Sequence, residues 1–228
     1  MSVLSFRRLL SQVCFATIFA AWVARGHYRR CWMFGPYLVA VWAGDAIPLR
    51  FPSIYTWDFW AAKEGLIAAL KLLLAFELYL RLFAGLPGAR RLANLPLLGL
   101  LVLTLGMLGK PKLHTDSVAL YVAIVPPATV GITLVLTLVL GLATLFRVPV
   151  GSVHRAILRG LVPFQLVNQF GMQAFATFGF DAQPLYNAFV PVAYDVLLMY
   201  WAVMFWRQQE EDAAPPAVVH RLRAWASS

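Results

Sequence analysis

The sequence predicts an all-α integral membrane protein, a polytopic bundle of seven transmembrane helices. Its 228 residues are 61% hydrophobic, against ~45–50% in an ordinary soluble domain. Only 13% of them are charged, which is about half the usual share. Too few polar side chains remain to cover a globule in water, so lipid is the expected solvent. The composition also excludes an intrinsically disordered chain, and two cysteines are too few for a disulfide scaffold.

Seven apolar segments, separated by charge clusters and Pro/Gly breaks, account for most of the chain. A bilayer core ~30 Å thick requires ~20 residues of helix, and an unpaired strand edge is not tolerated in hydrocarbon. We therefore expect one seven-helix transmembrane domain over 1–206 and a short cytoplasmic tail over 207–228. The expected spans are 9–24, 32–49, 57–80, 92–109, 118–146, 156–178 and 185–206.

Two of these segments depart from the length of a simple span. The first is short, and Arg7 and Arg8 before an apolar run that ends in small residues also fit a cleavable signal peptide. Arginines at both ends of the segment can extend their side chains to the headgroups. We interpret it as a short first helix and leave its cleavage open. The fifth segment is longer than a perpendicular span, which predicts a tilt or a kink at Pro126 and Pro127.

The distribution of basic residues predicts the orientation. If the seven helices alternate in direction, twelve arginines lie on one side, namely Arg25, Arg29, Arg30, Arg81, Arg90, Arg91, Arg147, Arg155, Arg159, Arg207, Arg221 and Arg223. The other side carries five basic residues: Arg7, Arg8, Arg50, Lys110 and Lys112. The positive-inside rule then places the N-terminus outside and the C-terminus in the cytoplasm. Because the arginines cluster at helix ends, the net charge of +9 does not indicate a nucleic-acid partner.

The third expected span carries an unusual number of charges. Lys63, Glu64, Lys71 and Glu77 lie within it, and Arg81 follows at its cytoplasmic end. Glu77 and Arg81 have the spacing of an i,i+4 ion pair. Glu64 and Lys71 are two turns apart, too far for a tight bridge but within reach of a shared partner. Since ionisable groups inside a bilayer are costly, we keep two interpretations: they hold this helix in the bundle, or they form a proton or ion relay.

Two other spans supply polar side chains that complete a candidate intramembrane polar site. Asp195 in the seventh span is a candidate carboxylate for Lys71. The sixth span carries amides that hold helices together or, less often, line a polar cavity. These amides are Gln165, Gln169 and Gln173, with Asn168 beside them.

Familiar catalytic and cofactor motifs are missing from the sequence. His27, His114, His154 and His220 lie in loops or in the tail, so we expect no metal or haem site within the bilayer. The seventh span has no lysine for a covalent retinal. The many aromatic side chains leave room for a bound lipid, quinone or pigment. These observations argue against an enzyme without deciding the question.

Several segments together carry a resemblance to known proteins. They are the basic loop 25–30, Trp60-Ala-Ala-Lys-Glu64, Ala75-Phe-Glu77-Leu-Tyr-Leu-Arg81, Gly85-Leu-Pro-Gly88-Ala-Arg-Arg91, and Tyr186-Asn187 with Pro191-Val-Ala-Tyr194. Over most of its length the chain resembles a broad group of uncharacterised small bacterial seven-transmembrane-helix proteins. The resemblance implies the fold and topology, with Glu64 and Glu77 matching two acids that recur in that group. Lys63 and Lys71 are outside the pattern, and the resemblance implies no chemistry.

These observations support three hypotheses for function. The first is a non-enzymatic protein of the bacterial inner membrane that works as an accessory or scaffold subunit of a larger complex, or as a sensor acting through a partner. Its partners would be the lipid bilayer and other membrane protein subunits. The second is a proton-linked carrier or channel for small solutes that uses the charged third span. The third is an intramembrane enzyme acting on a lipid or isoprenoid, with Glu64 or Asp195 as general acid.

Overall fold

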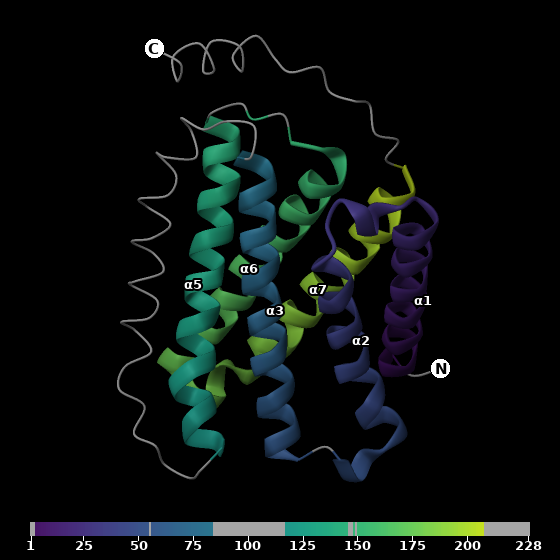
Figure 1. The fold of residues 1–228 in the computed structure, drawn as a ribbon. Helices are drawn as coiled ribbons and strands as arrows, with labels where there is room; N and C mark the ends of the chain where they lie inside the picture. The colour runs from purple at the N-terminus through teal and green to yellow at the C-terminus, as the bar shows by residue number, and fades with distance from the viewer. Residues whose placement is uncertain (1–2, 55, 84–116, 146–147, 149, 208–228) are drawn as a thin grey trace. The chain divides into compact units, whose positions relative to one another are not determined.

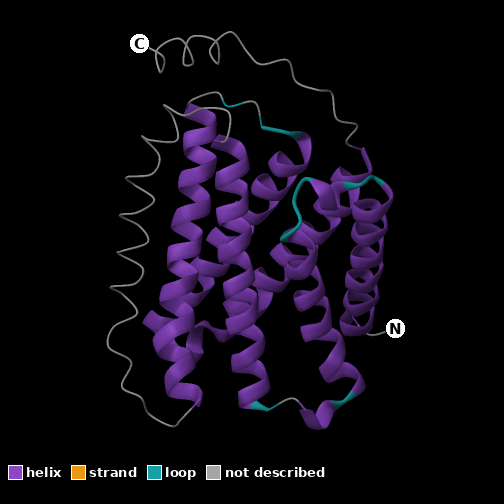
Figure 2. Cartoon of the chain, viewed as in Figure 1, coloured by secondary structure: helices purple, strands orange, loops and turns teal. Residues whose placement is uncertain are grey.

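The computed structural model describes residues 3–54, 56–83, 117–145, 148 and 150–207 (Figure 1). Throughout this part of the chain the regular structure is helical, as Figure 2 shows, so the all-α prediction is confirmed. The expected span 92–109 and the tail from 208 lie outside the described residues. The α-helices are α1 (Val3–Ala24), α2 (Phe34–Arg50), α3 (Trp57–Phe83), α5 (Ser117–Leu145), α6 (Ser152–Phe178) and α7 (Gln183–Arg207).

The first helix is longer than the sequence predicts. The first helix begins at Val3 and contains Arg7 and Arg8, which were expected to flank a shorter helix. Arginine is a good helix former, so a helix continues through such a pair without penalty. In α5, Pro126 and Pro127 lie inside the helix, and the expected tilt or kink at these residues stays a prediction.

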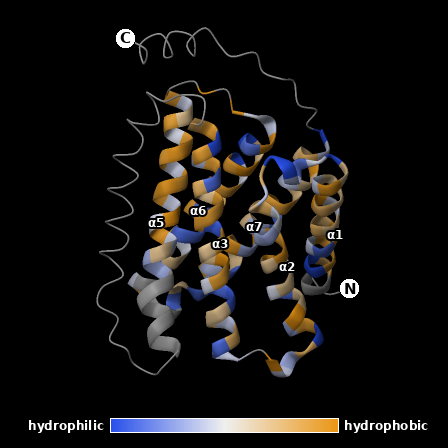
Figure 3. Cartoon of the chain, in the orientation of Figure 1, coloured by the Kyte–Doolittle hydropathy of each residue, from blue (hydrophilic) through white to orange (hydrophobic). Residues whose placement is uncertain are grey.

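Three of the described helices are long and apolar enough to cross a membrane: Phe6–Ala24 of α1, Pro126–Leu145 of α5, and Gln183–Arg207 of α7. Figure 3 shows the upper part of α5 mostly in orange, the colour of hydrophobic residues. The other three described helices fall short for different reasons. α2 has only 17 residues, α3 carries several charges, and α6 begins with arginines and continues with amides. These findings support a membrane protein with transmembrane helices.

The chain divides into two compact units, which we describe separately. The first comprises Met1–Leu38 and Ser152–Gln209, and the second comprises Val39–Gly151 and Glu210–Ser228. In the first unit α7 packs against both α1 and α6. In the second unit α3 packs against α5. The buried residues of α3 include Ile67, Leu74 and Leu78, which recur at helical spacing on one face.

Contacts along α7 give the directions of its neighbours. α1 and α7 run parallel, because Arg7 near the start of α1 reaches Asp195, and further along both helices the Trp206 indole donates to the Thr17 carbonyl oxygen. α6 runs antiparallel to α7. Its first turns lie beside the end of α7, where the Trp201 indole donates to the Ala156 carbonyl oxygen.

An aromatic cluster forms the core of the first unit. Trp201 packs edge-on against Phe34 with ring centroids 5.0 Å apart, and Phe205 stacks on Phe34 at 5.1 Å. Gly160 makes room for this cluster, since a Cβ there would lie 2.5 Å from the Trp201 indole nitrogen. Ala156 and Gly160 are one helical turn apart, and such small residues let a neighbouring helix approach closely. The start of α6 and the end of α7 are therefore held together by packing and by the indole hydrogen bond of Trp201.

Candidate functional site: charged residues within the helices

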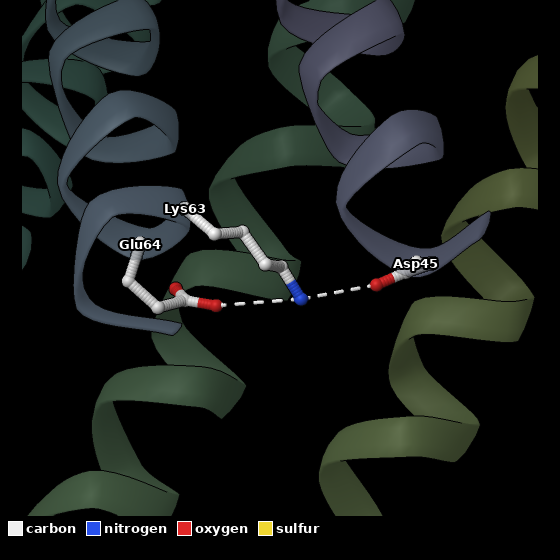
Figure 4. Close-up of polar contacts among 3 residues, drawn as sticks. All are labelled: Asp45, Lys63 and Glu64. Carbon is white, nitrogen blue, oxygen red and sulfur yellow. Dashed lines mark hydrogen bonds and ion pairs between the residues drawn. The ribbon is translucent and has the colours of Figure 1, made fainter. Parts of the chain in front are cut away.

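Lys63 of α3 lies between two carboxylates in the second unit (Figure 4). Its Nζ is 3.0 Å from Oδ1 of Asp45 on α2 and 3.7 Å from Oε1 of Glu64. Gly44 makes this approach feasible, because a Cβ there would lie 2.9 Å from two methylene carbons of Lys63. The lysine stem thus lies against the α2 backbone while its ammonium group binds Asp45. The sequence interpretation had not included Asp45.

Glu64 is shared between two lysines. It forms the longer of the two Lys63 contacts, and its charge also acts on Lys71, two turns further along α3. The partner that Glu64 and Lys71 were expected to share stays a prediction. Asp45, Lys63, Glu64 and Lys71 form a series of alternating charge that we call the α3 charge series.

Glu77 and Arg81 form the i,i+4 ion pair that their spacing predicts. The Arg81 Nε donates to Oε1 of Glu77 at 2.8 Å. Glu77 is buried and Arg81 is exposed. The pair therefore keeps one charge near the surface while its partner stays in the interior. This arrangement favours a structural role for Glu77.

Asp195 has a partner that the sequence did not identify. The Nε of Arg7 donates to Oδ2 of Asp195 at 2.6 Å and joins α1 to α7. The side chain of Asp195 is 12% exposed and that of Arg7 is 34% exposed, so the carboxylate is the more buried partner. The sequence interpretation had not paired Arg7 with Asp195. The expected pairing of Asp195 with Lys71 stays a prediction.

The amides of α6 do not share one environment. Gln165 is fully buried, Asn168 and Gln169 are intermediate, and Gln173 is exposed. Each step of four residues advances a helix by about 40° beyond a full turn, so a row of three amides turns away from the interior. The Oε1 of Gln169 is buried and has no hydrogen-bond partner among the described residues. Only part of the predicted amide row faces the core.

His27 is buried at the end of the first unit, in the turn that follows α1. Its Nε2 donates to the carbonyl oxygen of Phe205, at 3.2 Å. Nδ1 is also buried and has no hydrogen-bond partner in the described part of the chain. Burial lowers the pKa of His27 below its ordinary value of 6.5. The bond to Phe205 opposes this shift, and the charges of Arg30 and Arg25 add to it. The lowered pKa favours the neutral form of this imidazole over the charged form.

We expect the stability of the protein to fall as the pH drops below about 6.5. Above that pH His27 is neutral in both the folded and the unfolded chain. Below it the unfolded chain binds the proton more readily, because the folded-state pKa is lower. The midpoint of thermal unfolding in detergent, measured between pH 8 and 5, checks this. The variant His27→Gln should lose less stability over the same range, and an equal loss would contradict the prediction.

No group of three His, Cys, Asp or Glu side chains within the described ranges is arranged to hold a metal ion. The candidate site consists of the charged side chains and the helices that they join. Comparison with protein-family models, with curated proteins and with solved structures gave no match. The resemblance to small bacterial seven-helix membrane proteins consequently stays a prediction.

Proposed function

We propose that the protein is a non-enzymatic component of the bacterial inner membrane, acting as an accessory or scaffold subunit or as a sensor that works through a partner. The observation that carries this proposal is the pairing of charges between helices. Arg7 binds Asp195 across α1 and α7, and Lys63 binds Asp45 across α2 and α3. Charges that are committed to joining helices support a structural role for them better than a catalytic one.

The proposal includes seven transmembrane helices with an external N-terminus. Helices with odd positions in such a topology run in one direction, and α1 and α7 are parallel while α6 is antiparallel to α7. Ion pairs also make it feasible for α3 to cross the membrane, although its composition alone is too polar for a span. A paired charge is less costly to bury than a single one, and α3 carries two such pairs.

Purification from the native membrane in a mild detergent tests this proposal. We expect the full chain to migrate as a complex larger than its monomer and to retain a membrane protein partner at fixed stoichiometry. Quantitative mass spectrometry and light scattering measure both properties. A stable monomer that retains no partner would contradict the proposal.

A proton-linked carrier or channel is the second candidate, and the α3 charge series favours it. Glu64 interacts with Lys63 and with Lys71, so it connects two cations on one helix. Proton transfer between helical turns requires such a chain of ionisable groups. The test is proton flux into proteoliposomes that contain a pH-sensitive dye. Glu64→Gln and Lys71→Ala should abolish the flux and Arg50→Gln should not, whereas unchanged flux in the first two variants would exclude the relay.

A further inference from the structure

The imidazole of His27 caps the end of α7 from a distant part of the chain. Phe205 is two residues before the end of this helix, so its carbonyl oxygen is one of the last four, which no amide within α7 can reach. The Nε2–H of His27 donates to this oxygen at 3.2 Å. The His27 ring also lies edge-on against the Phe205 ring, with centroids 5.4 Å apart. One side chain of the turn after α1 therefore both caps α7 and packs on it.

The backbone of the same turn is organised around His27. Its carbonyl oxygen accepts from the amides of Arg30 and Cys31, at 3.0 and 3.1 Å. Gly26, directly before it, has a left-handed backbone (φ 67°) that would strain a residue with a side chain. The Cys31 side chain at the end of the turn is fully buried. A displaced His27 ring would therefore disturb the turn in which the Cys31 thiol is buried.

The site of the His27 ring suits one proton and not two. The residue is 3% exposed, its Nε2 carries the proton that Phe205 accepts, and its Nδ1 has no hydrogen-bond partner among the described residues. A neutral imidazole carries a proton on only one nitrogen, so Nδ1 can remain a bare lone pair here. A second proton would place a charged N–H where the described residues offer it no acceptor, which is strongly unfavourable.

Charges near the ring act in the same direction as its burial. Arg30 and Arg25 lower the pKa of His27, in addition to the larger effect of burial, and the bond to Phe205 opposes them only in part. One neighbour also titrates near neutral pH, namely His154 of α6, whose Nε2 bonds to the carbonyl oxygen of Arg30 at 3.1 Å. Its titration has to be separated from that of His27. The other titratable side chains on the segments that meet here are Tyr28, Arg29, Cys31, Arg155 and Arg207.

We propose that His27 is a proton-sensitive latch between the turn after α1 and the end of α7. With one proton the ring holds the Phe205 carbonyl oxygen, and the turn is closed. A second proton, taken from water at Nδ1, drives the ring out of its buried site. The hydrogen bond to Phe205 then breaks and the turn opens, which uncovers the Cys31 thiol while the helices stay folded. The latch lies within one unit of the chain, so it does not depend on the proposed role in a complex.

Chemical labelling of Cys31 measures the opening of the turn. In a Cys14→Ala background Cys31 is the only thiol, and its reaction with dithiodipyridine is followed in the full chain in detergent between pH 8 and 5. Each rate is divided by that of the unfolded chain at the same pH, which removes the intrinsic effect of pH on the thiol. An exposed ring with the ordinary pKa of 6.5 is about 97% protonated at pH 5. The normalised rate should therefore be ~10–30-fold higher at pH 5 than at pH 8.

Two histidine variants assign the pH effect to one ring. His27→Gln has a side-chain amide that can donate to Phe205 and does not titrate, so its normalised rate should be the same at both pH values. His154→Gln is the matched control and should retain the full pH effect. A pH effect that survives in His27→Gln, or that disappears in His154→Gln instead, would overturn the proposal.

A second labelling site separates local opening from unfolding. In a Cys31→Ala background the remaining thiol is Cys14 of α1, which is 6% exposed. Cys14 should stay protected at pH 5, because the latch opens only the turn after α1. An equal gain in the labelling of Cys14 and Cys31 would show that the whole unit unfolds, and the latch would be excluded.

Discussion

Trp201→Ala is expected to destabilise the protein by about 3–5 kcal/mol, the largest loss among single substitutions in the first unit. Trp201 is 1% exposed and packs edge-on against Phe34 and Tyr37. Truncation removes the whole ring from this cluster and leaves a cavity whose lining cannot fully collapse. It also removes the indole N–H from the Ala156 carbonyl oxygen. Reversible unfolding in mixed detergent micelles measures the loss.

Trp32→Ala is the matched control, since it removes an indole that is 54% exposed in the same unit. Its effect should stay below about 1 kcal/mol. Gly160→Ala tests the contact between α6 and Trp201 by adding a methyl group where there is no room. It should lower the free energy of unfolding by about 1–3 kcal/mol. Combining it with Trp201→Phe should reduce that cost, because the indole nitrogen nearest the added methyl group is then absent. Equal losses in Trp201→Ala and Trp32→Ala would contradict this account of the core.

Much of the helical structure could be predicted because it depends on local sequence. Long apolar runs separated by charges predict helices whatever their neighbours are, and all the expected spans within the described residues correspond to helices. Composition alone was less informative about membrane crossing. Of the described helices, only α1, α5 and α7 are long and apolar enough to cross a membrane, while α3 carries several charges and α6 carries arginines and amides. Local sequence also predicted Glu77 with Arg81, since both residues are on one helix.

The contacts between helices were harder to predict. Arg7 and Asp195 are 188 positions apart, and only the packing of α1 on α7 brings them together. The positions of Asp45 and Lys63 in the sequence give a weak indication that these residues form an ion pair. They lie at similar distances on either side of the turn Pro52–Ile54. Opposite charges that flank a helical hairpin in this way are expected to meet.

The Arg7–Asp195 pair should respond asymmetrically to the loss of each partner. Arg7→Leu leaves the more buried carboxylate without its cation, and breaking a buried pair in this way costs ~3–5 kcal/mol. Asp195→Leu leaves Arg7, whose side chain is 34% exposed and can turn toward water or headgroups. We expect about 3 kcal/mol for the first substitution and about 1–2 kcal/mol for the second.

The double variant Arg7→Leu with Asp195→Leu measures what the ion pair contributes to the free energy of unfolding. Two leucines of similar volume bury no charge, so the double variant should recover most of the stability lost in Arg7→Leu. Unfolding of the four proteins in one detergent completes the cycle, and Arg8→Leu provides an exposed neighbouring arginine as control. Losses that simply add would show that the two charges do not interact. Additive losses would therefore contradict a structural role for these two charges. Strong coupling would show that this pair joins α1 to α7.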